Sequence, residues 1–374
     1  MKGNGRGERA LLVYAHRKRT RGPAAILHVA EAMGELGDLV RAAGAEVAGS
    51  HVQSVDAEDP ATLVGKGTLS RLKEMAASGG ANLVVFQNLL KPKQQALIEE
   101  ALEVKTLDRR EIILDIFAQR ARSREGKMQV ELAQLSFRLG RLAGGRKDLS
   151  RLGGGIGTRG PGEKKLEEDR RRIRVLIRQL ERELATVRRT RQLHSRRRRE
   201  VGFPVVALVG YTNAGKSTLF NRMTGADVFV ADRMFATLDP TARKFRLPGG
   251  RDAILVDTVG FLHELPAELR RAFLATLEGI GEADLLLHVV DGSSDASESN
   301  VASVNAVLGE LSFLDKPHLL AVNKRDLCLP GSLAPEGAFR ISAKTGEGLR
   351  ELLAAIEREL WRHRPEKRGS TPPV

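Results

Sequence analysis

Val205-Val206-Ala207-Leu208-Val209, followed directly by Gly210-Tyr211-Thr212-Asn213-Ala214-Gly215-Lys216-Ser217, is the stretch of this 374-residue chain that decides its fold. The apolar run predicts a buried strand, and Thr218–Met223 predicts a helix behind the loop. A G-x-x-x-x-G-K-[ST] loop between a strand and a helix is typical of a phosphate site, because its backbone N–H groups and the helix dipole both favour an anion. The residues predicted here to bind a nucleotide are Gly210, Tyr211, Thr212, Asn213, Ala214, Gly215, Lys216, Ser217 and Thr218.

Two side chains of this loop and one further strand predict the groups that handle phosphate and metal. Lys216 is expected to reach the β- and γ-phosphates, and the Ser217 hydroxyl to ligate Mg²⁺. The apolar strand Ile254–Asp257 ends in a D-x-x-G sequence, in which we expect Asp257 to hold Mg²⁺ through water and the Gly260 N–H to meet the γ-phosphate. The nucleotide-site residues predicted in this segment are Asp257, Thr258, Val259 and Gly260.

A hydroxyl that reaches the metal only while the γ-phosphate is present is expected between these two motifs. We assign this role to Thr237, with Thr241 as the alternative. Three residues, Lys216, Thr237 and Gly260, are therefore predicted to be catalytic, and the predicted metal ligands are Ser217, Thr237 and Asp257. The loop residues predicted to lie at the nucleotide are Phe235, Ala236, Thr237, Leu238 and Asp239.

The N-K-x-D sequence at Asn323–Asp326, after the apolar strand Leu319–Val322, predicts the choice of base. The Asp326 carboxylate can accept hydrogen bonds from guanine N1–H and the 2-amino group, a pair that adenine does not offer. The pattern therefore predicts GTP, and it argues against the alternative of an ATP-using P-loop enzyme. The residues predicted to surround the base are Asn323, Lys324, Arg325, Asp326, Ser342, Ala343 and Lys344.

Phe261 stands where many GTPases carry a Gln that orients the attacking water. A phenyl ring can neither donate nor accept this hydrogen bond, so we expect slow intrinsic hydrolysis; His263 is an alternative candidate for the missing group. Asn213 stands where potassium-activated GTPases similarly place an Asn that helps to ligate K⁺. We therefore expect K⁺ beside the phosphates, where it would stabilise transition-state charge.

Residues 9–110 alternate between strand and helix patterns, which predicts a small parallel α/β domain. Val64–Gly67 lacks the spacing of a phosphate loop, so we interpret it as a turn. The expected strands are Ala10–Ala15, Glu46–Val52 and Leu83–Phe86, and the expected helices are Ile26–Ala42, Thr68–Ala77 and a helix from Pro92 to about Glu103.

Residues 112–200 predict an antiparallel helical hairpin with a Gly-rich basic tip. Two apolar seams recur at spacings of three and four, which marks helices that pack along a stripe. The tip sequence is GGRKDLSRLGGGIGTRGPGEKK, at residues 144–165. The seams are Met128, Leu132, Leu135, Leu139 and Leu142, and then Ile173, Leu176 or Ile177, Leu180, Leu184 and Val187.

The net charge of +14 is concentrated in this hairpin. Residues 151–200 carry 17 Lys and Arg against 7 Asp and Glu, whereas residues 201–374 carry 20 against 22. Clustered positive charge of this kind indicates a polyanion partner such as RNA. The single cysteine, Cys328, excludes an internal disulfide framework. The absence of a long apolar run and of a signal-peptide pattern predicts a cytoplasmic chain with no membrane span, and we expect a monomer.

The expected organisation is therefore an N-terminal α/β domain at residues 1–111, the basic hairpin at 112–200, a P-loop GTPase domain at 201–364 and a flexible tail at 365–374. The fold class is α/β.

Six motifs carry a resemblance to a known family: Asp115–Arg122, Glu125–Lys127, Gln129–Leu135, Gly154–Glu163, Phe235–Asp239 and Asp257–Phe261. In these motifs the chain resembles the HflX family of ribosome-associated GTPases, within the translation-factor-related class of P-loop GTPases. The resemblance covers residues 9 to 364. It implies binding to the large ribosomal subunit and its ribosomal RNA, splitting of stalled or idle 70S ribosomes, and hydrolysis that the ribosome stimulates. The alternatives are an RNA-binding GTPase of RNA maturation or modification, and an RNA-binding scaffold with a regulatory nucleotide site.

Overall fold

Two units make up the protein in its computed structural model, and the boundary between them falls at Thr186 and Val187. No helix in the described part of the chain is long and apolar enough to cross a membrane. The structure describes residues 7–18, 23–144, 161–226, 234–235, 241–261, 280–294, 296–328 and 335–362.

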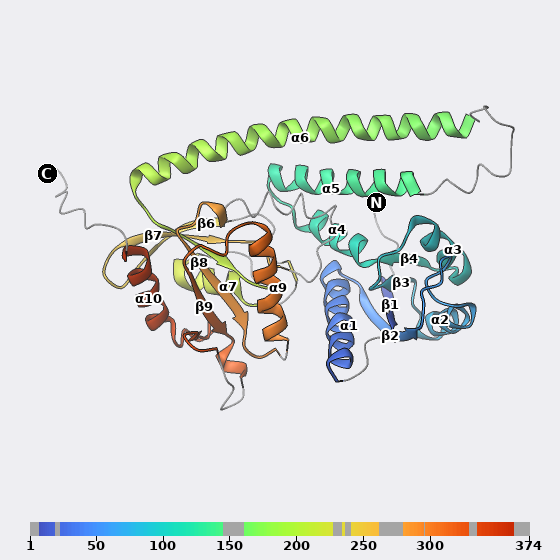
Figure 1. The fold of residues 1–374 in the computed structure, drawn as a ribbon, viewed down its shortest axis with the longest axis horizontal. Coiled ribbons are helices and arrows are strands. Elements are labelled where there is room, and N and C mark those ends of the chain that lie inside the picture. The colour runs from blue at the N-terminus through green and yellow to red at the C-terminus, as the bar shows by residue number, and fades with distance from the viewer. Residues whose placement is uncertain are drawn as a thin grey trace. The chain divides into compact units, whose positions relative to one another are not determined.

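The first unit is built on a four-stranded sheet whose strand pairs are all parallel, in the order β2-β1-β3-β4 (Figure 1). The predicted parallel α/β fold is therefore confirmed. The sequence pattern does not predict β4, because its inward-facing residues, Thr106 and Asp108, are polar. The strands are β1 (Arg9–Arg17), β2 (Glu46–Val55), β3 (Leu83–Phe86) and β4 (Lys105–Asp108).

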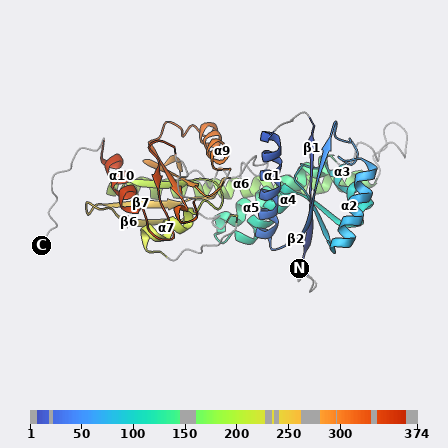
Figure 2. The ribbon, with the colours of Figure 1, turned by 90° about the horizontal axis from the view of Figure 1, so that it is seen from below.

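Helices cover both faces of this sheet (Figure 2). On one face α1 packs with α4, and on the other α2 packs with α3. Leu11 and Val13 of β1 lie in the same buried cluster as Leu72 and Ile98 of the second face. Val64–Gly67 leads into α2, and Gly80 ends that helix in the left-handed conformation. The helices are α1 (Pro23–Ala43), α2 (Lys66–Gly79), α3 (Pro92–Leu102) and α4 (Arg109–Arg120).

Two further helices, α5 (Arg124–Gly144) and α6 (Pro161–Val201), form the predicted antiparallel hairpin (Figure 1). Arg124 at the start of α5 pairs with Glu183, whereas the carbonyl of Leu142 near its end accepts a hydrogen bond from Arg170. The predicted α6 seam contains Ile177 and excludes Leu176, which is 39% exposed. Of the predicted Gly-rich tip, residues 145–160 lie outside the described residues, whereas Gly144 ends α5 and residues 161–165 belong to the start of α6.

A partly buried polar network connects α5 with α4 and with the end of β4. Asp108 caps α4 by accepting the Arg110 N–H, and the same carboxylate pairs with the Arg110 guanidinium. Arg141 of α5 lies 3.5 Å from Glu111, and the guanidinium groups of Arg110 and Arg141 each stack on Phe137. Burial raises the pKa of Glu111, which the Arg141 charge opposes. The boundary expected after residue 111 thus falls inside a helix that begins at Arg109.

The second unit contains a six-stranded sheet in the order β10-β9-β8-β5-β7-β6, in which only the β6–β7 pair is antiparallel. The helices α7 and α10 share one buried core with β5, and α9 lies against β8. The strands are β5 (Val205–Val209), β6 (Thr241–Arg246), β7 (Asp252–Asp257), β8 (Leu285–Asp291), β9 (His318–Asn323) and β10 (Phe339–Arg340). The helices are α7 (Lys216–Thr224), α9 (Ser297–Glu310), α10 (Leu349–Trp361) and the 3-10 turn η2 (Arg325–Leu327).

Candidate nucleotide-binding site

The predicted phosphate loop connects β5 to α7 and holds a buried lysine at its end. Lys216 Nζ donates hydrogen bonds to the carbonyl oxygens of Gly210 and Tyr211 at 3.0 and 2.7 Å. Gly215, at φ 87°, precedes the helix, and a side chain there would collide with Asn323. Burial lowers the pKa of Lys216 to about 8, and the charge of Asp257 opposes this shift. An anion beside Nζ would stabilise the charged form in the same way.

Ser217 and Asp257, two of the predicted metal ligands, lie in contact across the site. The Ser217 hydroxyl donates to Asp257 Oδ2 at 2.8 Å, and Asp257 is fully buried at the end of β7. Oxygen donors of these two kinds fit Mg²⁺, which usually binds one or two protein ligands together with phosphate oxygens and water. The described part of the chain holds no group of three or more His, Cys, Asp or Glu that could hold a metal ion.

The D-x-x-G segment folds directly onto the phosphate loop. Thr212 N–H donates to the Phe261 carbonyl at 2.9 Å, and Phe261 N–H donates to the Gly210 carbonyl at 3.1 Å. A side chain on Gly260 would place its Cβ only 2.7 Å from Thr212 Cα, so this close approach requires glycine. The buried Thr258 hydroxyl donates to the Leu208 carbonyl at 2.5 Å, which holds the start of the segment against β5.

On the side predicted to hold the base, Asn323 joins three parts of the chain. Its Nδ2 donates to the Ala214 carbonyl at 2.9 Å, and its Oδ1 accepts the Ala343 N–H at 2.9 Å. Asp326 Oδ1 accepts a hydrogen bond from the Ser342 hydroxyl at 2.6 Å. These hydrogen bonds bring together the phosphate loop, the N-K-x-D sequence and the segment after β10.

Asp291 is a residue of this region that the sequence analysis missed. Lys324 adopts the left-handed conformation at φ 61°, and its Nζ lies 2.7 Å from Asp291 Oδ2. The sequence contains a pattern that could have predicted this residue, because Asp291 ends the apolar strand β8. Polar residues at the carboxyl ends of neighbouring parallel strands meet at one edge of a sheet.

The remaining predicted residues fall in different surroundings. Asn213 is exposed at φ 61°, Phe235 is buried at φ 55°, and Thr241 pairs with Asp257 in the β6–β7 ladder. Val259 is buried, Thr218 is half-buried, and Arg325 and Lys344 are exposed. The residues Ala236, Thr237, Leu238, Asp239 and His263 lie outside the described ranges.

His288, buried in β8 beneath this site, makes stability depend on pH. Burial lowers its pKa to about 4, with contributions from the charges of Lys216 and His318. Because this is below the ordinary value of 6.5, the unfolded chain takes up a proton that the folded chain refuses. The stability due to the neutral imidazole is therefore present above pH 6.5 and is lost as the pH falls toward 4.

Between pH 7 and pH 5 we expect the free energy of unfolding of the second unit to fall by about 2 kcal/mol more in the parent chain than in His288→Leu. Urea unfolding followed by the fluorescence of Trp361, the single tryptophan, measures this, because Trp361 packs against the core of that unit. Equal pH slopes in the two proteins would contradict it.

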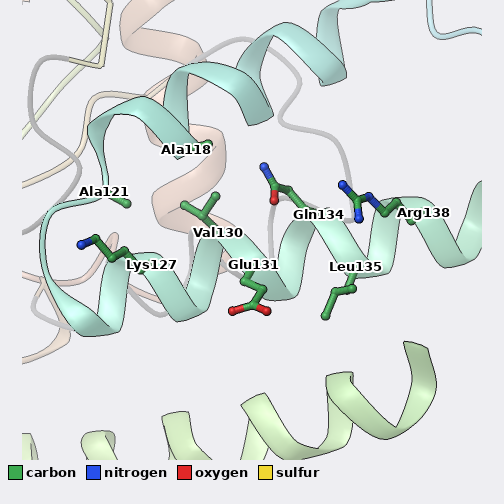
Figure 3. A pocket seen from close by; sticks show the side chains of 8 residues that line it. All are labelled: Ala118, Ala121, Lys127, Val130, Glu131, Gln134, Leu135 and Arg138. Atoms are coloured by element: carbon green, nitrogen blue, oxygen red, sulfur yellow. The ribbon is translucent and has the colours of Figure 1, made fainter. Parts of the chain in front are cut away.

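A pocket of about 350 Å³ lies between α4 and α5 (Figure 3). All of its lining residues belong to the first unit, whereas the residues of the nucleotide site belong to the second. All but one of its lining residues belong to the motifs between Asp115 and Leu135 that carry the family resemblance, and Arg138 lies in the next turn of α5. The lining residues are Ala118, Ala121, Lys127, Val130, Glu131, Gln134, Leu135 and Arg138.

A phosphate loop ending in a buried lysine, a D-x-x-G segment folded onto it and an N-K-x-D sequence joined to it define a P-loop GTPase domain. Three family models match the chain: "GTP-binding GTPase N-terminal" over residues 30–118, "GTP-binding GTPase Middle Region" over 120–198 and "50S ribosome-binding GTPase" over 205–324.

Relatives of known family extend the match to most of the chain. GTPase HflX of Caldanaerobacter subterraneus subsp. tengcongensis is 51% identical over 335 residues, which covers 89% of this chain and 78% of that protein. GTPase HflX of Escherichia coli is 41% identical over 362 residues, which covers 95% and 83%. This chain belongs to the HflX family of GTPases, and it binds guanine nucleotide and hydrolyses GTP.

A solved structure shares the fold. The crystal structure of SsGBP in complex with GDP matches with a TM-score of 0.51 at 23% identity, covering 95% of this chain and 99% of that chain. At this identity the likeness concerns the fold alone.

Proposed function

We propose that this GTPase acts in the cytoplasm as a monomer, binds the large ribosomal subunit through ribosomal RNA, and dissociates stalled or idle 70S ribosomes. The description of the matching GTPase family as ribosome-binding supports the partner. The observation that carries the proposal is a stripe of arginines on α6, the longer helix of the hairpin.

The stripe consists of Arg171, Arg178, Arg182 and Arg189. It follows one face of α6, opposite the face that packs on α5. Its members are separated by seven, four and seven residues, which at 3.6 residues per turn places them within about 20° of one line over about 27 Å. Leu180 and Leu184, on the opposite face, are buried. All four arginines are exposed, and none has an ion-pair partner among the described residues, whereas Arg174 pairs with Glu167.

A row of unpaired guanidinium groups fits a phosphate backbone, because each contact releases counterions from the nucleic acid. The part of the Gly-rich tip that lies outside the described residues, 145–160, adds four cationic residues to the sequence between the two helices. We propose that stripe and tip together grip ribosomal RNA. The tip cations are Arg146, Lys147, Arg151 and Arg159.

Ribosome binding should therefore depend on salt and on the stripe. Each phosphate contact contributes about 0.7 to 0.9 to the log–log salt slope, so four or five contacts predict a slope of about −3 to −4. Replacing the four stripe arginines by Ala should bring this slope toward zero and weaken co-sedimentation with 50S subunits in the presence of a non-hydrolysable GTP analogue. Replacing the four tip cations should lower ribosome splitting further than it lowers binding.

The control removes the same number of exposed positive charges from the α2–α3 side of the sheet, and we expect it to bind as the parent chain does. GTP affinity without ribosomes should be unchanged in all variants. Normal splitting of 70S ribosomes by both the stripe and the tip variants would contradict the proposal. The control positions are Lys66, Arg71, Lys73 and Lys93.

Hydrolysis is proposed to be slow without the ribosome. Phe261 is fully buried, and its backbone is held by the phosphate loop, so the residue after Gly260 offers no polar side chain to the attacking water. Mg²⁺ held by Ser217 and Asp257 would neutralise charge on the phosphates. Turnover of GTP with and without ribosomes measures the stimulation.

A K⁺ ion beside Asn213 is a further prediction. A cation there would stabilise charge that develops on the phosphates, so turnover should be higher in potassium than in sodium at equal ionic strength. Asn213→Ser should remove the difference. Equal rates in the two salts for the parent chain would contradict a K⁺ site.

A further inference from the structure

Thr212 lies where the phosphate loop meets the D-x-x-G segment. A Cβ placed on Gly260 would lie 2.7 Å from Thr212 Cα, 2.8 Å from its Cγ2 and 3.0 Å from Lys216 Nζ. Lys216 and the Gly260 N–H are the two groups expected to meet the γ-phosphate. The side chain of Thr212 therefore borders the place where this phosphate is expected.

The hydroxyl of Thr212 is buried and unsatisfied. Thr212 is 7% exposed, and its Oγ1 has no hydrogen-bond partner within the described part of the chain. Its methyl group faces Gly260, and a β-branched side chain has few rotamers, so the direction of the hydroxyl is restricted. A buried hydroxyl without a partner is unfavourable, which indicates that a bound molecule supplies one.

The surroundings indicate which molecule this is. The three atoms nearest to a Cβ placed on Gly260, its chain neighbours aside, belong to Thr212 and Lys216, and the adjacent Phe261 has no polar side-chain atom. Thr212 N–H is already committed to the Phe261 carbonyl, so the hydroxyl is the free donor of this residue.

We propose that the Thr212 hydroxyl donates a hydrogen bond to an oxygen of the γ-phosphate and so helps the protein to distinguish GTP from GDP. GDP has no γ-phosphate, so the contact forms only with the triphosphate. Thr212 is then a specificity-determining residue of the GTPase. The proposal rests on the nucleotide site described above.

The test compares Thr212→Val, which keeps the shape and removes the hydroxyl, with Thr212→Ser, which keeps the hydroxyl. The Kd values of GDP and of guanosine 5′-(β,γ-imido)triphosphate are measured by calorimetry on the full chain with Mg²⁺. For Thr212→Val we expect about a tenfold weaker Kd for the imido analogue, as for a lost hydrogen bond to a charged group. The Kd of GDP should change by less than about twofold. Thr212→Ser should retain most of the preference for the triphosphate.

Two results would overturn the proposal. One is that neither Kd changes in Thr212→Val, which would mean that ordered water alone satisfies the hydroxyl. The other is an equal loss of both nucleotides, which would make the role structural. Failure of the nucleotide site itself would be seen separately, as a parent chain that binds neither nucleotide.

Discussion

Lys216→Ala is expected to weaken GTP binding at least a hundredfold, which corresponds to about 3 kcal/mol. Lys216 Nζ is held by two backbone carbonyls at the base of the phosphate loop, so its charge faces the site in one position. A charge-assisted hydrogen bond contributes about 1.5–3 kcal/mol, and the lysine is expected to reach two phosphates. Fluorescence titration with a labelled GTP analogue measures the loss.

The matched control for this variant is Arg350→Ala, which removes an exposed positive charge of α10 in the same unit. We expect its GTP affinity to equal that of the parent chain. Circular dichroism should show that both variants remain folded. Binding by Lys216→Ala within twofold of the parent would exclude this loop as the phosphate site.

Asp326→Asn should exchange the base preference of the protein. The new amide cannot accept the hydrogen bonds of guanine N1–H and the 2-amino group, so GTP affinity should fall about a hundredfold or more. Xanthosine triphosphate carries an oxygen at C2, to which the amide can donate, so its affinity should rise. Competition between the two nucleotides against a labelled analogue gives both changes in one experiment.

Asp315→Asn is the matched control, because it removes an exposed carboxylate from the loop before β9. Its preference for GTP should be unaltered. The Ser342 hydroxyl, which donates to Asp326, can also donate to the amide oxygen of the variant, so the loop should keep its conformation. An unchanged preference for guanine in Asp326→Asn would remove Asp326 from the base site.

The GTPase domain could be predicted from sequence because its motifs are local. Each follows an apolar strand, and the carboxyl ends of parallel strands bring separate motifs to one edge of the sheet. The contacts between motifs could not be predicted in the same way. The hydrogen bond from Ser342 to Asp326 and the ion pair between Lys324 and Asp291 join residues whose proximity depends on strand order, which a single sequence does not contain.

The first unit shows the same limit in its polar interior. The buried positions of β4 are occupied by Thr106 and Asp108, whereas the sequence pattern of a buried strand has apolar residues at such positions. Asp108 is buried because it caps α4 and pairs with Arg110, and both partners come from the following helix. The sequence could not decide whether Leu176 or Ile177 belongs to the apolar seam of α6. Both fit the spacing of three and four residues, and the choice depends on which face of α6 packs against α5.

Asn323 holds neighbouring segments of the site together, and Asp326 is not needed for these hydrogen bonds. Its amide holds the phosphate loop and the segment after β10, so the side chain of Asp326 remains available for the proposed contact with the base. Asp326 can therefore be replaced without breaking the hydrogen bonds by which Asn323 holds the phosphate loop and the segment after β10. In a cell extract, where GTP drives many enzymes at once, an Asp326→Asn chain supplied with xanthosine triphosphate could be switched on by itself, which would allow its action to be timed against an otherwise undisturbed background.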